Sequence, residues 1–164
     1  MNDRVLRMVA EAESRIHDAE LIGQSLRSQS DSQSLLKVLA LEVLLKALLL
    51  KDTGAIQRSH KYVDLWAKLP MATRCKVLEV ARARYPGHAD LTNVEKLLCV
   101  YEFIFTKARY GYELYDDMSL EEQAHLGEDW LARGAPTEEA DLQYFPMELS
   151  ALLEGLLQEV RSAA

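Results

Sequence analysis

The sequence predicts an all-α fold, and three observations support this prediction. Apolar residues recur at intervals of three and four along most of the chain, as they do in amphipathic helices. The alternating apolar and polar runs that are typical of strands are absent. Only seven Gly and four Pro interrupt 164 residues, so helices can be long. We therefore expect a single all-helical domain, residues 1–164, built as one bundle of about six or seven helices around a sizeable core.

The first two helices are separated by a polar turn. The first is predicted from Asp3, a good N-cap residue, to about Arg27. The turn is the Ser-Gln-Ser-Asp-Ser segment at residues 28–32. The second helix is predicted over 32–51, and Gly54 provides a typical end signal.

The second helix is the most informative segment of the chain. Its sequence over Leu35–Leu50, LLKVLALEVLLKALLL, is apolar nearly all round, which predicts a position at the centre of the bundle. Glu42 and Lys46 are the exceptions near its middle, and they lie one turn apart. A buried charge is costly unless it is paired, and a spacing of four allows the pairing. The pair is either a structural ion pair or the floor of a functional site.

Breaks at proline and glycine divide the middle of the chain. A short helix is predicted over Tyr62–Leu69 and ends before Pro70. A further helix is predicted over about Ala72–Arg84, and the Pro86-Gly87 pair marks the next break.

The last part of the chain predicts three more helices. A long one is expected over Thr92–Asp116, with an apolar and aromatic face. Ser119-Leu-Glu-Glu122 is a capping-box sequence that opens another helix, which Gly134 ends. Pro146 suits the first turn of a final helix that runs to about Arg161. Because the connections are short, we expect consecutive helices to be antiparallel neighbours.

Charge is unevenly distributed along the chain. The net charge is −7, yet residues 111–164 hold 13 acidic and two basic residues, a balance of −11. This acidic third is unsuited to nucleic acid, because phosphate binding needs cations. It would suit a basic protein partner or the chain's own basic half, and the alternative is a solvated face that aids solubility.

Polar side chains interrupt the apolar faces at three places: on the central helix, in the loop before Tyr62, and near the end of the long helix. Arg109 and Glu113 are four apart and would share a helix face. We predict a network in which Glu42 accepts hydrogen bonds from Arg109 or His60. The predicted cluster, either ligand-binding or structural, consists of Glu42, Lys46, His60, Arg109, Tyr112 and Glu113.

The pattern resembles the HEPN superfamily, the higher eukaryote and prokaryote nucleotide-binding domains. The resemblance covers about Leu35–Tyr115 and consists of the segment LEVLLKALL at residues 41–49, His60 with a Leu five residues later, and the segment ARYGYE at residues 108–113. It implies a small α-helical bundle that usually forms homodimers. It also implies a bacterial role in toxin–antitoxin or other defence systems, with a nucleotide or RNA as ligand.

Many HEPN proteins are metal-independent RNases, and their signature is an Arg followed after four to six residues by a His. Arg109 matches the Arg, but the positions for the His hold Leu114, Tyr115 and Asp116. None of these can move a proton as an imidazole does at neutral pH. Arg82 and His88 have the right spacing, but they span a loop break, and we interpret the match as chance. We therefore expect no catalytic residues, and a metal-independent RNase is kept as an alternative.

Two functional hypotheses from different classes follow. The first is a HEPN-like, non-catalytic module associated with a nucleotide or RNA. The second is an acidic antitoxin or immunity-type protein that neutralises a basic partner.

The histidines and cysteines lack metal-ligand spacing, so we expect no metal and no cofactor. Cys75 and Cys99 are interpreted as reduced thiols of a cytoplasmic protein, and no segment predicts membrane insertion. The tyrosines of the long helix are assigned to the core, with base stacking as the alternative.

Overall fold

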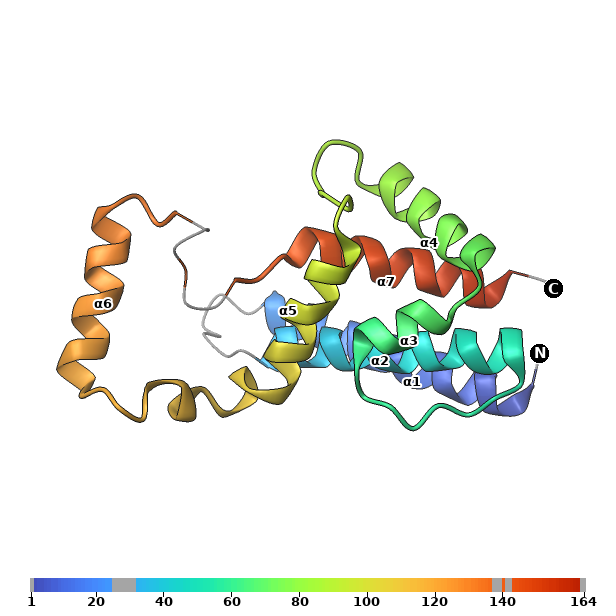
Figure 1. Cartoon of the computed structure of the whole chain (residues 1–164), viewed down its shortest axis with the longest axis horizontal. Helices are drawn as coiled ribbons and strands as arrows, with labels where there is room; N and C mark the ends of the chain where they lie inside the picture. Colours follow the sequence, from blue (N-terminus) through green and yellow to red (C-terminus); the bar gives the residue numbers. More distant parts are fainter. Residues whose placement is uncertain (1, 25–31, 137–139, 141–142, 163–164) are drawn as a thin grey trace.

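Helices make up the regular structure of this chain (Figure 1). The computed structural model describes residues 2–24, 32–136, 140 and 143–162, without the side chains of residues 108, 109, 111 and 114. Within this part the elements are α1 (Asp3–Gly23), α2 (Ser32–Thr53), α3 (Tyr62–Lys68), α4 (Met71–Arg84), α5 (Val94–Thr106), the 3₁₀ helix η1 (Ala108–Tyr115), α6 (Leu120–Ala132) and α7 (Pro146–Arg161). The all-α prediction and the expected helix number are confirmed.

Helix α2 is central, as its composition predicts. It packs against α1, α3, α5 and α7, and α4 in turn packs on α7. Ten of its 22 residues are buried, because apolar side chains project from every side of the helix. Burying one Leu side chain contributes about 1.5–3 kcal/mol. This helix therefore organises the core that positions the polar cluster.

Close packing of α4 on α7 depends on a glycine. A Cβ atom at Gly155 would come within 2.3 Å of the Val77 carbonyl oxygen. The missing side chain lets the two helix backbones approach closely. Such an approach explains a glycine inside a helix, where it otherwise costs about 1 kcal/mol.

Polar contacts fasten the ends of the bundle. The Lys51 ammonium group donates to the carbonyl oxygens of Glu159 and Ser162 at 2.8 Å each, so a cation satisfies carbonyl groups at the end of α7. Arg161 forms an ion pair with Glu13 of α1. The two contacts fix the end of α7 against α2 and α1.

The limits of the first two helices differ from the predicted ones, whereas α3 and α4 agree with their predicted limits to within one residue. The N-cap of α1 is Asn2 and not Asp3, because the Asn2 side chain accepts from the Arg4 amide at 2.8 Å. Helix α1 ends at Gly23, and residues 25–31, which hold most of the predicted polar turn, lie outside the described residues. Helix α2 continues to Thr53, and Gly54 follows with φ +70°, as an end signal should.

The long helix predicted over 92–116 is wrong in its second half. Helix α5 ends at Thr106, and η1 follows with a non-helical kink at Tyr110 (φ −115°, ψ 62°). The Thr106 hydroxyl donates to the Glu102 carbonyl oxygen at 2.8 Å, a contact that bends helices. Gly111 adds its low helix propensity just beyond. The apolar face of the predicted helix therefore continues only to the end of α5.

Helix α6 departs from the predicted bundle of consecutive neighbours. It stands apart from the other helices at one end of the molecule (Figure 1). None of its residues is buried. Its predicted capping box is present, since the side chains of Ser119 and Glu122 each accept from the other residue's backbone amide. The local signal is therefore confirmed, but the packing inferred from loop length is not.

Candidate functional site

A buried carboxylate lies at the centre of the candidate site. Glu42 is only 4 % exposed on α2. Its Oε1 atom accepts from the Lys46 Nζ at 2.8 Å and lies 2.9 Å from the His60 Nδ1. Glu42 precedes Lys46 by four residues, which is the favourable order for a helix pair. We call Glu42, Lys46 and His60 the Glu42 cluster.

His60 reaches this carboxylate from the loop that connects α2 to α3. Its side chain is 68 % exposed, although its Nδ1 atom contacts a buried group. Because an ionised carboxylate only accepts hydrogen bonds, the contact assigns the ring hydrogen to Nδ1. The Nε2 atom makes no hydrogen bond within the described residues. The cluster therefore holds an accessible imidazole in a set orientation.

Lys46 has a different environment from His60. Its side chain is 15 % exposed, so most of it is packed within the fold. Its ammonium group forms an ion pair with Glu42 at 2.8 Å. Lys46 is thus placed to neutralise the carboxylate, whereas His60 is the accessible member of the cluster.

One oxygen of Glu42 has no described partner. The Oε2 atom is buried and accepts no hydrogen bond from any described group. Arg109 was the other predicted donor, and its side chain lies outside the described part of the structure. The predicted contact between Glu42 and His60 is present, and the contact with Arg109 stays a prediction.

Tyr62 is a buried residue near Glu42 that bonds to two neighbouring helices, and this role was not anticipated from the sequence. Its hydroxyl donates to the Val38 carbonyl oxygen, and its backbone amide donates to the Glu102 Oε2, each at 2.9 Å. Burial raises the pKa of Tyr62 well above its usual range, and the carboxylates of Glu42 and Glu102 add to this effect. The phenol stays neutral and joins α2, α3 and α5. The sequence signal was an acidic residue, Glu102, within the otherwise apolar run over 97–105.

Tyr112 and Glu113 do not belong to the Glu42 cluster. Both are exposed on η1, and neither has a hydrogen bond or ion pair with the cluster among the described contacts. They interact with each other, because the Glu113 carboxylate raises the pKa of Tyr112. The kink at Tyr110 separates them from the end of α5. The predicted six-residue cluster is therefore smaller in the described structure.

Four tyrosines were predicted for the core, and they differ in burial, with Tyr115 partly buried on η1. Tyr101 is fully buried and donates to the Phe145 carbonyl oxygen at 2.8 Å. Tyr110 and Tyr112 are exposed, with ring centroids 6.1 Å apart. The core prediction is confirmed for Tyr101 and wrong for Tyr110 and Tyr112, because η1 leaves the bundle where α5 ends.

Arg82 and His88, the second Arg–His pair with the RNase spacing, do not contact each other among the described contacts. The Arg82 guanidinium donates to the Leu91 carbonyl oxygen at 3.4 Å, and His88 is exposed after the Pro86-Gly87 turn.

Cys75 and Cys99 are exposed free thiols. The described residues contain no group of three potential metal ligands. They also contain no helix with the length and apolar character that crossing a membrane requires.

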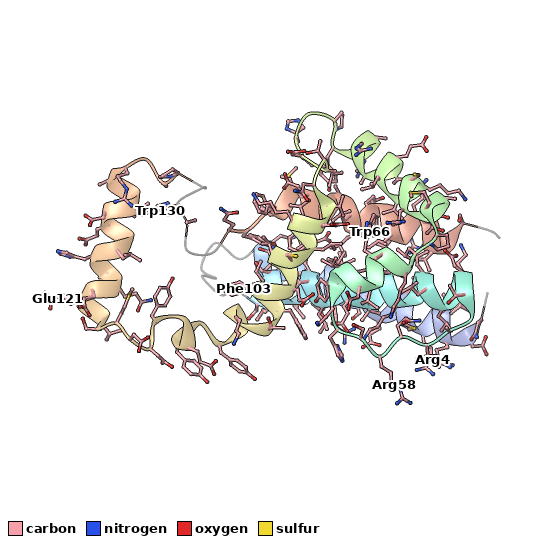
Figure 2. The ribbon with its side chains drawn as sticks, viewed as in Figure 1. Arg4, Arg58, Trp66, Phe103, Glu121 and Trp130 are labelled. Carbon is pink, nitrogen blue, oxygen red and sulfur yellow. The ribbon has the colours of Figure 1, made fainter. Side chains whose placement is uncertain are left out.

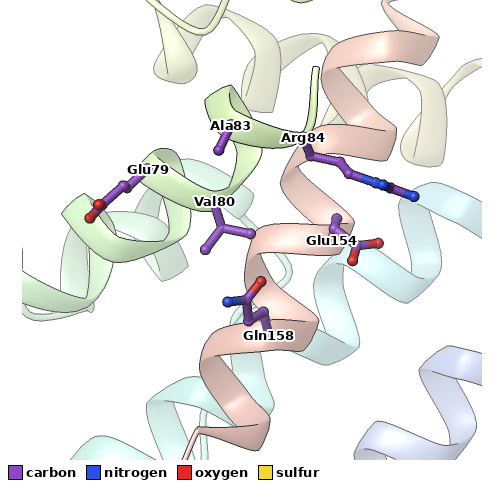
Figure 3. A pocket seen from close by; sticks show the side chains of 6 residues that line it. All are labelled: Glu79, Val80, Ala83, Arg84, Glu154 and Gln158. Atoms are coloured by element: carbon purple, nitrogen blue, oxygen red, sulfur yellow. The ribbon is translucent and has the colours of Figure 1, made fainter. Parts of the chain in front are cut away.

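A shallow pocket of about 360 Å³ lies elsewhere, between α4 and α7 (Figure 3). Its lining side chains are mostly exposed and include no buried titratable group: Glu79, Val80, Ala83, Arg84, Glu154 and Gln158. Lacking a buried polar group to orient a ligand, it offers a weaker basis for function than the Glu42 cluster.

Comparison of the chain with protein-family models, with curated proteins and with solved structures found no match. A functional proposal therefore depends on the residues and their geometry.

Proposed function

We propose that this chain is a HEPN-like, non-catalytic helical module that binds the phosphate-bearing part of a nucleotide or RNA beside His60. The observation that carries the proposal is the accessible imidazole held by a buried carboxylate at 2.9 Å. An imidazole fixed at one nitrogen loses little freedom when the other nitrogen binds a ligand. When protonated, it donates a charge-assisted hydrogen bond to phosphate.

Charged neighbours in the same loop support this choice of ligand. Arg58 and Lys61 are exposed on either side of His60, and Arg58 projects away from the bundle (Figure 2). Cations next to a positioned imidazole favour phosphate groups. The segment over 58–61 therefore offers two cationic side chains and an oriented ring.

The resemblance to HEPN proteins supports the biological part of the proposal. It implies a homodimer that works in a toxin–antitoxin or other defence system. Cleavage of RNA is not part of the proposal, because Leu114, Tyr115 and Asp116 stand where the catalytic His would fall.

Binding is tested with two probes at low salt: ATP by calorimetry and a fluorescein-labelled 12-nucleotide single-stranded RNA by anisotropy. His60→Gln is expected to weaken binding about 10-fold or more, since a hydrogen bond to a charged group contributes about 1.5–3 kcal/mol. The matched control is His88→Gln, which removes an exposed histidine outside the cluster. Arg58→Gln should weaken binding less, and Arg4→Gln on α1 should not.

Two results would change the proposal. Equal binding by His60→Gln and His88→Gln, or no binding of either probe, would contradict it. Cleavage of the labelled RNA that disappears in His60→Gln would replace the binding module by the metal-independent RNase.

A further inference from the structure

Helix α6 exposes an apolar stripe that no other part of the described chain covers. Leu120 and Leu131 are 86 % and 65 % exposed. Residues at spacings of four, three and four lie on one helix face. That face consists of Leu120, Ala124, Gly127 and Leu131, and all four are exposed. The stripe extends along most of α6, a helix of 13 residues that is about 20 Å long.

The helix forms because its ends are capped, and not because it is packed. The Ser119 backbone amide and hydroxyl each donate to the Glu122 Oε2 at 2.8 Å, and these bonds lower the pKa of the Glu122 carboxyl. At the other end the Trp130 indole donates to the Pro136 carbonyl oxygen at 2.9 Å. A helix of this length is marginal in water without tertiary packing. It therefore gains stability when another surface covers its stripe.

The charge around α6 indicates which kind of partner surface would cover its stripe. Residues 111–136, which we call the arm, contain seven acidic residues and one basic residue, a balance of −6. A second arm would repel the first, and residues 1–110 of a second copy carry a balance of only +4, so a strongly basic partner complements the arm better than a second copy does. On α6, Glu121 and Glu128 flank the stripe along one side, where they would meet the rim of a bound partner, whereas Asp129 lies on the opposite face of the helix.

Gly127 adds a steric argument at the middle of the stripe. A Cβ atom built there would meet nothing within 4 Å, so the described chain gives no packing reason for a glycine. A glycine inside a helix costs about 1 kcal/mol. Gly155 shows the use of such a residue in this molecule, where it admits the α4 backbone. A partner backbone that approaches closely would use Gly127 in the same way.

We propose that the stripe of α6 docks a basic protein, whose apolar strip or groove is bordered by Lys and Arg side chains. Apolar contact along the stripe supplies affinity, and the acidic residues beside it supply orientation and association rate. This inference does not depend on the nucleotide or RNA proposal, because it uses another part of the molecule.

The test uses Trp130 as a reporter in a Trp66→Phe background, since Trp66 lies in the bundle and Trp130 on α6 (Figure 2). The probe is a 20-residue helical peptide with a Leu stripe bordered by Lys and Arg. Two matched peptides replace the Leu residues by Ser, or the basic residues by Glu. We expect a change in Trp130 fluorescence on addition of the first peptide, and affinity at least tenfold lower for each of the others.

Variants of the chain locate the binding. The double variant Leu120→Ser with Leu131→Ser should weaken binding at least tenfold, and Glu121→Gln with Glu128→Gln should increase the dissociation constant and reduce its dependence on salt. Leu21→Ser with Met71→Ser is the control for the first, because it replaces exposed apolar residues on α1 and α4. Glu20→Gln with Glu95→Gln is the control for the second.

Three outcomes would overturn the proposal. One is equal binding of the Leu and Ser peptides, which would reduce the contact to charge alone. Another is no binding of the basic Leu peptide. The third is self-association of the chain in sedimentation velocity that Leu120→Ser with Leu131→Ser removes, which would make a second copy the occupant. Helix content measured by circular dichroism confirms that the variants remain folded.

Discussion

Helices α2 and α6 obtain their stability from different sources. Helix α2 buries ten residues and contacts four other helices, so its position depends on apolar packing from every side. Helix α6 buries none and depends on its capping box and on the bond from Trp130. Polar residues consequently have different roles in the two helices. In α2 the charge of Glu42 requires partners, whereas in α6 the acidic residues are solvated.

The largest expected effect comes from removing the buried carboxylate. Glu42→Ala leaves the largely buried Lys46 without its partner and releases His60, so the free energy of unfolding should fall by about 3–5 kcal/mol. Urea denaturation measures the change. The control on the arm is Glu128→Ala, which removes an exposed carboxylate of α6 and should leave the denaturation curve unchanged. If Glu42→Ala had wild-type stability, the buried carboxylate of α2 would be no more important for stability than the solvated carboxylates of α6.

An intermediate effect is expected from a pair of glycine substitutions. Gly155→Ala forces apart the backbones of α4 and α7 and should reduce the free energy of unfolding by about 1–3 kcal/mol. Gly127→Ala meets no neighbour and should raise the helix content of α6, because Ala is favoured over Gly by about 1 kcal/mol in a helix. Thermal denaturation and circular dichroism measure the two effects. A destabilising Gly127→Ala would mean that α6 packs against its own chain.

The smallest effect is expected from a tyrosine hydroxyl. Tyr62→Phe removes the bond to the Val38 carbonyl oxygen and should cost about 1 kcal/mol at pH 7. Because burial raises the pKa of Tyr62 in the folded state, the neutral phenol stabilises the fold fully below the unfolded pKa of about 10. This contribution decreases as the pH rises above that value. Wild-type stability should therefore fall more steeply between pH 10 and 11 than that of Tyr62→Phe.

The arm provides the control for this pH dependence. Tyr112 is exposed, and its pKa is raised mainly by Glu113. Absorbance at 295 nm should show its phenolate forming while the bundle stays folded. Because Glu113 is its neighbour in the unfolded chain as well, Tyr112→Phe should change the alkaline loss of stability much less than Tyr62→Phe does. If the stability of wild type and of Tyr62→Phe fell equally with pH above 10, the result would contradict the buried environment assigned to Tyr62.

Much of the fold was predictable, because its signals lie close together in the chain. The central position of α2, the Glu42–Lys46 pair, the end at Gly54 and the capping box at Ser119 each depend on a few neighbouring residues. The end of α5 was missed, because an apolar period predicted a helix across residues that bend the chain. The free energy differences among α-helix, 3₁₀ helix and kink there are small.

The sequence alone determined the all-α class, most of the helices, the capping box at Ser119 and the uneven charge, because these follow from local periodicity and composition. The sequence offered His60 and Arg109 as alternative partners of Glu42, and the tertiary structure showed that His60 makes the contact from 18 residues away. Only the tertiary structure decided that Tyr62 contacts Glu102 and that α6 stands outside the bundle. The physical reason is that such contacts depend on the packing of all the helices together. An amphipathic stripe shows that a helix can be covered, and only the arrangement of the whole chain shows whether it is.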